Sequence, residues 1–238
     1  MERPGGVHEG DPPGGDRVNP EHAALIDGEP LPRERVDSFL VAPHRGAGNC
    51  ATSHDGPAPA RLQIEAPSVA RQRRRWATQV IVTDELARRA CADRGLKVPE
   101  EVSPASVLAV AETDVADLGS IVAAALAHSP AVRTLLAALE AEQTVPETAV
   151  RDYYDRNQDR FLTPDALRRG VDPFGRTAAP EDLLPYDAVR DPITRELRTA
   201  AGRQAFFGWL DQARAGVTYS HGHEHPGDPS HPDHEHRH

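Results

Sequence analysis

Residues 144–161, TVPETAVRDYYDRNQDRF, constrain the fold most strongly, because they carry the signature of an amphipathic helix that needs a packing partner. The threonine that opens the stretch and Glu147 have the spacing of a capping box, which bonds the free N–H groups of a helix start. Val150, Tyr153 and Tyr154 follow at i, i+3 and i+4 and share one helical face. The sequence therefore predicts a helix that buries its tyrosine face.

A second long helical pattern covers residues 186–215. Its apolar residues recur at intervals of three, four or seven positions, which places them on one face of a helix. We expect the tyrosine face of the 144–161 helix to pack on this face, near Ile193, Leu197 and Phe207.

Shorter patterns complete a mainly helical fold. Ser129 precedes Pro130, the order expected of an N-cap followed by proline at the first helical position. Asp27 and Gly28 form a turn dipeptide after an apolar run. We predict a mainly α body with a small β element formed by short N-terminal and C-terminal strands. The other predicted helices cover residues 33–40, 68–94 and 103–142, and the predicted strands cover 23–26 and 217–219.

The net charge limits the class of partner. The 238 residues carry a formal charge of −10, whereas proteins that bind nucleic acid or anionic membranes present a basic face. The run RQRRR at residues 71–75 is typical of a solvated helix face, with a nucleic-acid contact as the alternative. We expect neither a nucleic-acid nor a membrane partner.

The N-terminal region and the cysteines favour a cytoplasmic location. Residues 1–21 are rich in glycine, proline and charge, which predicts disorder, and they lack the apolar core of a secretory signal. No apolar run reaches the length of a membrane span. Cys50 and Cys91 suit a reduced compartment, with one disulfide as the alternative. Cys50 and His54 could form a metal or nucleophile pair, but such a pair in a loop rich in glycine and proline is more often incidental.

The order of these segments resembles the SurA/PpiC-type parvulin family of peptidyl-prolyl isomerases and chaperones. IDGEPLPRERVDSFL is similar to the strand, turn and helix that open the family's chaperone domain. VPETAVRDYYDRNQDRF is similar to the helix that leads into its parvulin domain, and residues 185–219 are similar to its closing helix and strand. The matching positions are Gly28, Glu29, Val145, Tyr154, Asn157 and Phe161.

This resemblance covers residues 23–238 and implies a SurA-N-like helical chaperone domain over residues 22–220. RQRRRWATQVIVTDELARRA and the ending HEHPGDPSHPDHEHRH are similar to actinobacterial relatives that carry the labels peptidyl-prolyl isomerase or malonyl-CoA–ACP transacylase. A transacylase of that type needs a serine on a Gly-x-Ser-x-Gly elbow. The sequence has no such motif, and Ser120 lies inside a helical pattern.

The chain departs from the family where the catalytic domain belongs. Only residues 162–184 lie between the two helices that normally flank the parvulin domain, and a domain needs at least about 50 residues. The segment also lacks the histidine pair that parvulins place around the substrate proline. We predict a loop here, apart from a turn or so near residues 164–167, and no catalytic residues, with a residual prolyl isomerase as an alternative function.

Histidine is concentrated in the tail, residues 221–238, together with aspartate and glutamate. Imidazole is a good ligand for Zn²⁺, Ni²⁺ and Cu²⁺, and alternate residues of an extended chain share a face. The sequence thus predicts a possible metal-binding tail, with a polar tail that takes up metal only adventitiously as the alternative. The candidate ligands are His221, His223, His225, His231, His234, His236 and His238.

The sequence suggests a peptide- or protein-binding chaperone module, with metal handling as a second possibility. Its partner would be an unfolded or dedicated client protein, held in an apolar groove between helices. The few large aromatic residues are the candidates for lining that groove, although such residues more often build the core. They are Trp76, Tyr153, Tyr154, Phe206 and Trp209.

Overall fold

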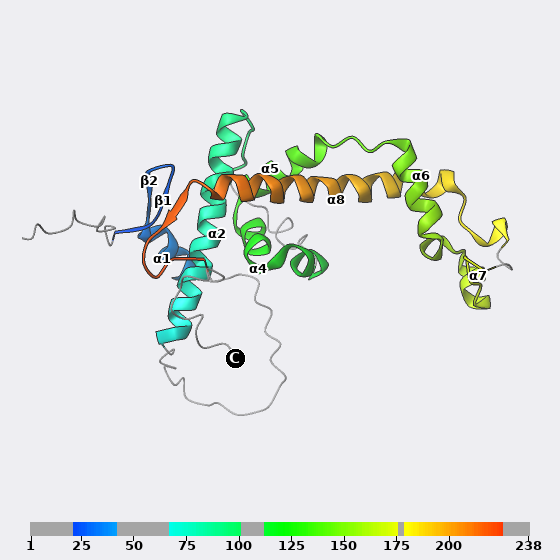
Figure 1. Ribbon diagram of the computed structural model, residues 1–238, viewed down its shortest axis with the longest axis horizontal. Coiled ribbons are helices and arrows are strands. Elements are labelled where there is room, and N and C mark those ends of the chain that lie inside the picture. The colour runs from blue at the N-terminus through cyan, green and yellow to red at the C-terminus, as the bar shows by residue number, and fades with distance from the viewer. Residues whose placement is uncertain (1–20, 42–66, 101–111, 176–178, 226–238) are drawn as a thin grey trace, which may run out of the picture. The chain divides into compact units, whose positions relative to one another are not determined.

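The computed structural model describes residues 21–41, 67–100, 112–175 and 179–225 (Figure 1). They are mainly helical with one three-stranded antiparallel sheet, as the sequence predicts. The helices are α1 (Arg33–Val41), α2 (Pro67–Asp93), α4 (Glu112–His128), α5 (Pro130–Ala141), α6 (Glu147–Arg156), α7 (Pro164–Arg169) and α8 (Tyr186–Arg214). The strands are β1 (His22–Ile26), β2 (Glu29–Pro32) and β3 (Val217–Tyr219), and two 3-10 turns are η1 (Gln158–Phe161) and η2 (Pro180–Asp182).

The predicted helical domain comprises two compact units. The first unit holds the described residues up to Val82 together with those from Gly216 onward, and the second unit is Thr83–Ala215. The predictions for residues 1–20, Cys50 and His54 lie outside the described residues.

The sheet of the first unit joins the two ends of the described chain, in the order β2-β1-β3. Asp27 and Gly28 both have positive φ, 52° and 82°, which is the backbone of a tight two-residue hairpin turn. On the other side of β1, Ala24 pairs with Tyr219 and the two strands run antiparallel. The small β element predicted from the two terminal strands is confirmed.

Helices α1 and α2 supply the rest of the first unit's core. Val36 is fully buried, and the Phe39 ring lies 5.8 Å from that of Trp76. The Tyr219 hydroxyl donates to Gln79 Oε1 on α2 at 2.9 Å. This contact ties the end of the sheet to the buried face of the helix.

In the second unit, α8 packs beside α5 and, further along, against α6 (Figure 1). Ser129 caps α5 as predicted, since its Oγ accepts from the Val132 amide at 3.1 Å. Cys91 is buried as predicted, and burial raises the pKa of its thiol. The Thr199 hydroxyl of α8 donates to Glu140 Oε1 of α5 at 2.5 Å.

The tyrosine face of α6 packs against α8, as its amphipathic pattern predicts. Val150 forms a buried cluster with Val189 and Ile193, and Tyr153, Tyr154 and Leu197 pack around it. The expectation for Phe207 is wrong, because this residue lies several turns further along α8 and its ring contacts Phe206.

The predicted capping box at the start of α6 is also wrong. Pro146 occupies the N-cap, and no side chain bonds the first N–H groups there. The Glu147 carboxylate instead accepts from the Tyr186 hydroxyl at 2.5 Å and from Arg190 Nε at 2.9 Å. The hydrogen bond from Tyr186 and the nearby Arg190 lower the pKa of Glu147.

The described part of residues 162–184 is more regular than the predicted loop. Thr163 caps α7 through a bond from the Ala166 amide, and Gly170 ends α7 with a left-handed backbone. Leu162 and Leu183 form an antiparallel bridge that brings the two ends of the segment together. A short helix and turns therefore make up the described part of this segment.

Candidate functional site

An apolar hollow of about 220 Å³ lies between α4 and α8, within the second unit. Val122 and Leu210 form its buried side, while Ile121 and Phe207 are half-buried. We call it the α4–α8 hollow. Its lining residues are Gly119, Ile121, Val122, Phe207, Leu210, Asp211 and Arg214.

Gly119 shapes the α4 side of this hollow. Its φ of 75° and ψ of 158° interrupt α4, so that the helix continues in a new direction from the next residues. Side chains disfavour this backbone, whereas glycine adopts it readily. The break, which the helical pattern of residues 103–142 did not predict, sets where Ile121 and Val122 lie.

The charged residues of the α4–α8 hollow are Asp211 and Arg214. Arg214 Nη2 donates to Thr83 Oγ1 at 3.2 Å. The Nε of Arg214 is buried and has no acceptor among the described residues. A guanidinium carries five N–H donors, so this side chain retains capacity to bond a carbonyl or carboxylate oxygen.

The five aromatic residues predicted to line a groove lie in three different places. Trp76 contacts Phe39 in the first unit. Tyr153 and Tyr154 pack in the α6–α8 cluster, where the Tyr154 hydroxyl donates to the Leu184 carbonyl at 2.7 Å.

The other two predicted aromatics lie near the α4–α8 hollow without lining it. Phe206 is a core residue with 1% exposure, and its ring lies 5.3 Å from that of Trp209. Phe207, which follows in sequence, is the aromatic residue that lines the hollow. Helical periodicity assigned it to the face toward α6, and its true neighbours on α4 gave no local signal.

A larger hollow, of about 480 Å³, runs along α8. Glu196, which lines it, already accepts from Arg160 at 2.8 Å and from the Tyr153 hydroxyl at 2.6 Å. Arg195, Thr199 and Arg203 lie along the same stretch of helix. This hollow lacks the large apolar residues that would hold an apolar side chain.

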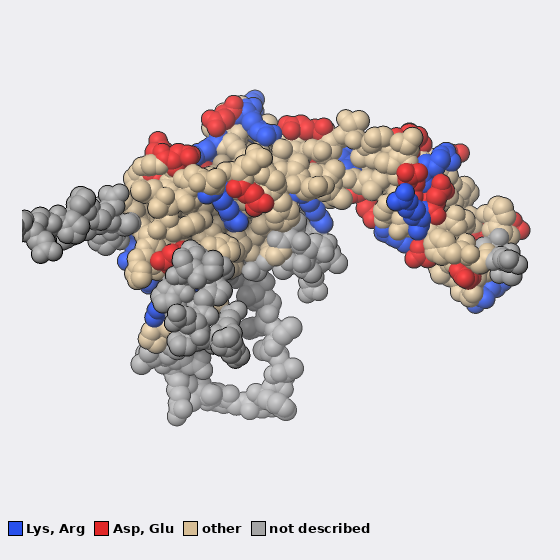
Figure 2. Space-filling model, viewed as in Figure 1, with Lys and Arg blue, Asp and Glu red and all other residues tan. Residues whose placement is uncertain are grey.

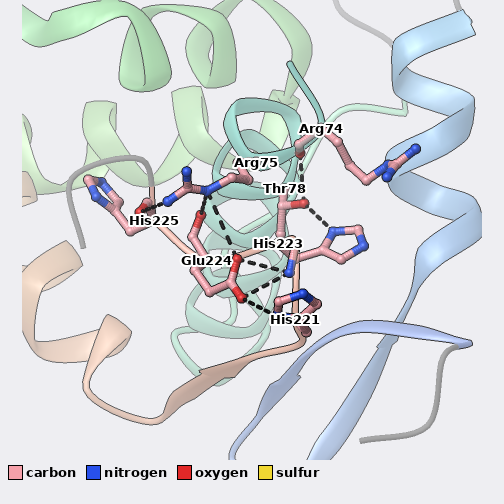
Figure 3. A network of polar contacts seen from close by, with 8 residues as sticks. Arg74, Arg75, Thr78, His221, His223, Glu224 and His225 are labelled. Carbon is pink, nitrogen blue, oxygen red and sulfur yellow. Dashed lines mark hydrogen bonds and ion pairs between the residues drawn. The ribbon is translucent and has the colours of Figure 1, made fainter. Parts of the chain in front are cut away.

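The first three histidines of the predicted metal-binding tail follow β3 in the first unit, and Figure 3 shows them in three different settings. The His221 side chain is 94% exposed, and its Nδ1 lies 3.5 Å from Glu224 Oε1. His223 is buried at 4% exposure. The ring of His225 points away from the other two (Figure 3).

His223 is held by α2. Its Nδ1 lies 2.8 Å from Thr78 Oγ1, and Thr78 donates its single hydroxyl proton to the Arg74 carbonyl at 2.9 Å. Nδ1 is therefore the protonated nitrogen that donates to Thr78. Burial, with the positive charges of Arg33 and Arg74, lowers the pKa of His223 to about 4.

The Arg75 side chain holds the same segment by bonding two of the segment's backbone carbonyls. This arginine is only 4% exposed, and it donates from Nε to the Glu224 carbonyl at 3.1 Å and from Nη2 to the His225 carbonyl at 2.8 Å (Figure 3). One member of the basic cluster at residues 71–75 is thus a buried structural residue.

The structure does not bring the histidines together as ligands. Among residues 21–41, 67–100, 112–175 and 179–225, no three His, Cys, Asp or Glu side chains form a group that could hold a metal ion. His231, His234, His236 and His238 lie outside these ranges, and metal binding by the tail stays a prediction.

Two general features bear on the class of partner. Acidic and basic residues are interspersed over the visible face of the described chain (Figure 2). No single helix in the described part of the chain is long and apolar enough to cross a membrane. One pair of helices, Ile121–His128 and Pro130–Ala141, reaches that length and apolar character together, but the two are bent by 105° relative to each other.

The comparisons with known proteins return no relative: no family model, curated protein or solved structure matches this chain.

Proposed function

We propose that the chain is a cytoplasmic, SurA/PpiC-like chaperone module that binds an apolar side chain of an unfolded or dedicated client protein and has no prolyl isomerase activity. The observation that supports this most is the α4–α8 hollow, which combines apolar walls with an arginine at the same place. The order of sequence motifs that resembles the family supports it independently.

The size of the hollow indicates what it holds. Pockets for drug-sized ligands and cofactors measure about 300–1,000 Å³, and the α4–α8 hollow, at about 220 Å³, is smaller. Ile121, Val122, Phe207 and Leu210 would enclose one apolar side chain of an extended peptide. Arg214 would bond a backbone carbonyl beside it, so that recognition depends little on the rest of the client sequence.

The segment at residues 162–184 supports the absence of isomerase activity. Its described residues form α7, η2 and connecting turns, and no histidine occurs in the segment. We expect the full chain to leave the isomerisation rate of a proline peptide unchanged. Clear catalysis in that assay would contradict the proposal.

Suppression of client aggregation tests the binding function. Chemically denatured citrate synthase is diluted into buffer with increasing amounts of the full chain, and light scattering is followed. Ile121→Glu places a charge in the α4–α8 hollow, and Val69→Glu is the matched control because Val69 is 47% exposed on α2. We expect the wild type and Val69→Glu to suppress scattering equally, and Ile121→Glu to need at least about tenfold more protein. No suppression by excess wild type, or equal suppression by Ile121→Glu, would overturn the proposal.

A further inference from the structure

Phe174 is an exposed aromatic residue on the segment of residues 162–184. Its exposure is 63%, and among the described residues it is the only aromatic one in the set of exposed large apolar residues. Leu167 on α7, at 60% exposure, belongs to the same segment. The segment buries Leu162, at 8% exposure, yet leaves both Leu167 and Phe174 exposed.

The turn that carries Phe174 is held in place. Asp172 Oδ1 accepts from the Phe174 amide at 3.0 Å, and the Gly175 amide donates to the Asp172 carbonyl at 3.1 Å. A Cβ atom on Gly175 would lie 3.2 Å from that carbonyl oxygen, so the turn is suited to glycine. A ring presented by an ordered turn loses less conformational freedom on binding than a ring on a flexible loop.

The base of the segment is fixed as well. Asp182 is buried, accepts from the Ala179 amide at 3.0 Å and forms an ion pair with Arg169. The Leu184 amide donates to the Phe161 carbonyl at 2.7 Å. These contacts hold the base of the segment beside the start of α8.

Phe174 and the α4–α8 hollow complement each other in shape and charge. The hollow has room for about one side chain and is walled by apolar residues. Asp172 lies next to Phe174 in the turn, whereas the exposed Arg168 on the preceding helix is ion-paired with Asp165 at 2.9 Å. The hollow offers Arg214 as the charge opposite to Asp172.

One copy of the chain cannot place its own Phe174 in its own hollow. The segment joins α8 at Tyr186, whereas the hollow is formed by the stretch from Phe207 to Arg214. At 1.5 Å per residue, these two places are roughly 30 Å apart along the helix. Figure 1 shows α7 beyond the N-terminal end of α8. The two surfaces can meet only between copies.

We propose that Phe174 of one copy occupies the α4–α8 hollow of a second copy, in a head-to-tail contact. Such a contact uses different surfaces on the two partners and leaves each pair with one free ring and one free hollow, so that further copies can add. This inference rests on the proposed function, because the same hollow would bind a client side chain. Clients and self-association then compete, and each copy covers the binding site of a neighbouring copy when no client is present.

Sedimentation velocity over a range of concentrations tests the contact. We expect the mass of the wild type to rise with concentration, and Phe174→Ala to need at least about tenfold higher concentration, as loss of a central aromatic anchor typically causes. Val69→Ala, at another exposed apolar position, should behave as the wild type. A wild type that stays monomeric, or a Phe174→Ala variant that associates like it, would overturn the proposal.

Mixing two defective variants provides a sharper test. Phe174→Ala keeps an intact hollow, and Ile121→Glu keeps an intact ring. Together they should form a 1:1 dimer that adds no third copy, although neither associates alone. Arg214→Glu serves as the hollow variant if Ile121→Glu does not fold. No dimer in the mixture of folded variants would contradict a head-to-tail contact.

The aggregation assay separates this inference from the proposed function. Phe174→Ala should suppress client aggregation at equal or lower protein concentration than the wild type, because its hollow is not occupied by a second copy. If association depends on Phe174 but no variant suppresses aggregation, the inference stands and the chaperone function fails. If suppression depends on Ile121 but association does not depend on Phe174, the function stands and the inference fails.

Discussion

A Cβ atom on Gly202 of α8 would lie 2.7 Å from the Cα atom of Glu140 on α5. The two backbones therefore approach each other as closely as a residue without a side chain allows. Gly202 is buried and lies in the middle of α8. The position of α5 against α8 depends on this contact. The position of the helices that follow Ser129 depends on it in turn.

We predict that Gly202→Ala destabilises the chain. The methyl group meets backbone atoms, which cannot move aside as a flexible side chain can, and overpacking of this kind costs about 1–3 kcal/mol. Gly208→Ala is the control, because a Cβ atom there meets nothing within 4 Å among the described residues. The control should gain about 0.5–1 kcal/mol from helix propensity. Urea denaturation of both variants measures the difference, and an equal gain in both would contradict the close approach.

We predict that His223 makes the stability of the chain fall with acidification. Its pKa is lowered from 6.5 to about 4 in the folded chain. The unfolded chain therefore binds an extra proton as the pH falls through this window, and folding loses up to about 3 kcal/mol between pH 6.5 and pH 4. Above pH 6.5 the residue is neutral in both states and contributes no pH dependence.

Comparison of variants isolates this contribution from that of the carboxylates nearby, Asp37 and Glu224. The free energy of unfolding of His223→Gln should vary less steeply than that of the wild type between pH 6.5 and pH 4. His221→Gln is the control, since the His221 side chain is 94% exposed. Parallel pH profiles for the wild type and His223→Gln would show that His223 is not buried as a neutral residue.

We predict that Asp182→Asn loosens the segment at residues 162–184. The Ala179 amide and the Arg169 guanidinium both donate to this carboxylate and lower its pKa. Asparagine cannot offer two acceptor oxygens, so one of these donors loses its partner. Limited proteolysis should cut Asp182→Asn faster than the wild type in this segment, with Asp187→Asn, at an exposed position, as the control. Equal cleavage rates would mean that other contacts hold the segment.

We predict that metal binding by the C-terminal histidines does not use His223 and depends mainly on the four histidines furthest along the tail, His231, His234, His236 and His238. His223 is engaged by Thr78 and lies in the core of the first unit. Calorimetry with Zn²⁺, Ni²⁺ and Cu²⁺ should therefore compare the full chain with a variant that has alanine at those four positions. Truncation before His223 is unsuitable, because it removes contacts that hold the fold. Equal, weak binding by both proteins would exclude a metal-binding tail.

Local patterns predicted the elements whose determinants are close together in sequence. The serine that caps α5, the long helix from Tyr186 and the Asp27–Gly28 turn each follow from adjacent residues. The two terminal strands were also recognisable, although their pairing joins distant parts of the chain.

The predictions failed where distant residues compete for the same group. Glu147 has the right spacing for a capping box, but Tyr186 and Arg190 bind its carboxylate and Pro146 occupies the cap. Phe207 shares its periodicity with the residues that pack on α6, but in the structure it lines the hollow beside the kink of α4 at Gly119. Composition marked the histidines as ligands, whereas Thr78, far away in sequence, holds one of them in the core.

The pairing of β1 with β3 has a consequence for the order in which the chain folds. Ala24 is among the first described residues to leave the ribosome, and its partner Tyr219 is among the last. Closing so long a loop has a high entropic cost and places the sheet late in folding. The second unit lies wholly between these strands and can form before they meet. A nascent chain that stops before Tyr219 leaves β1 with only β2 beside it, so the three-stranded sheet cannot be completed until this point has been synthesised.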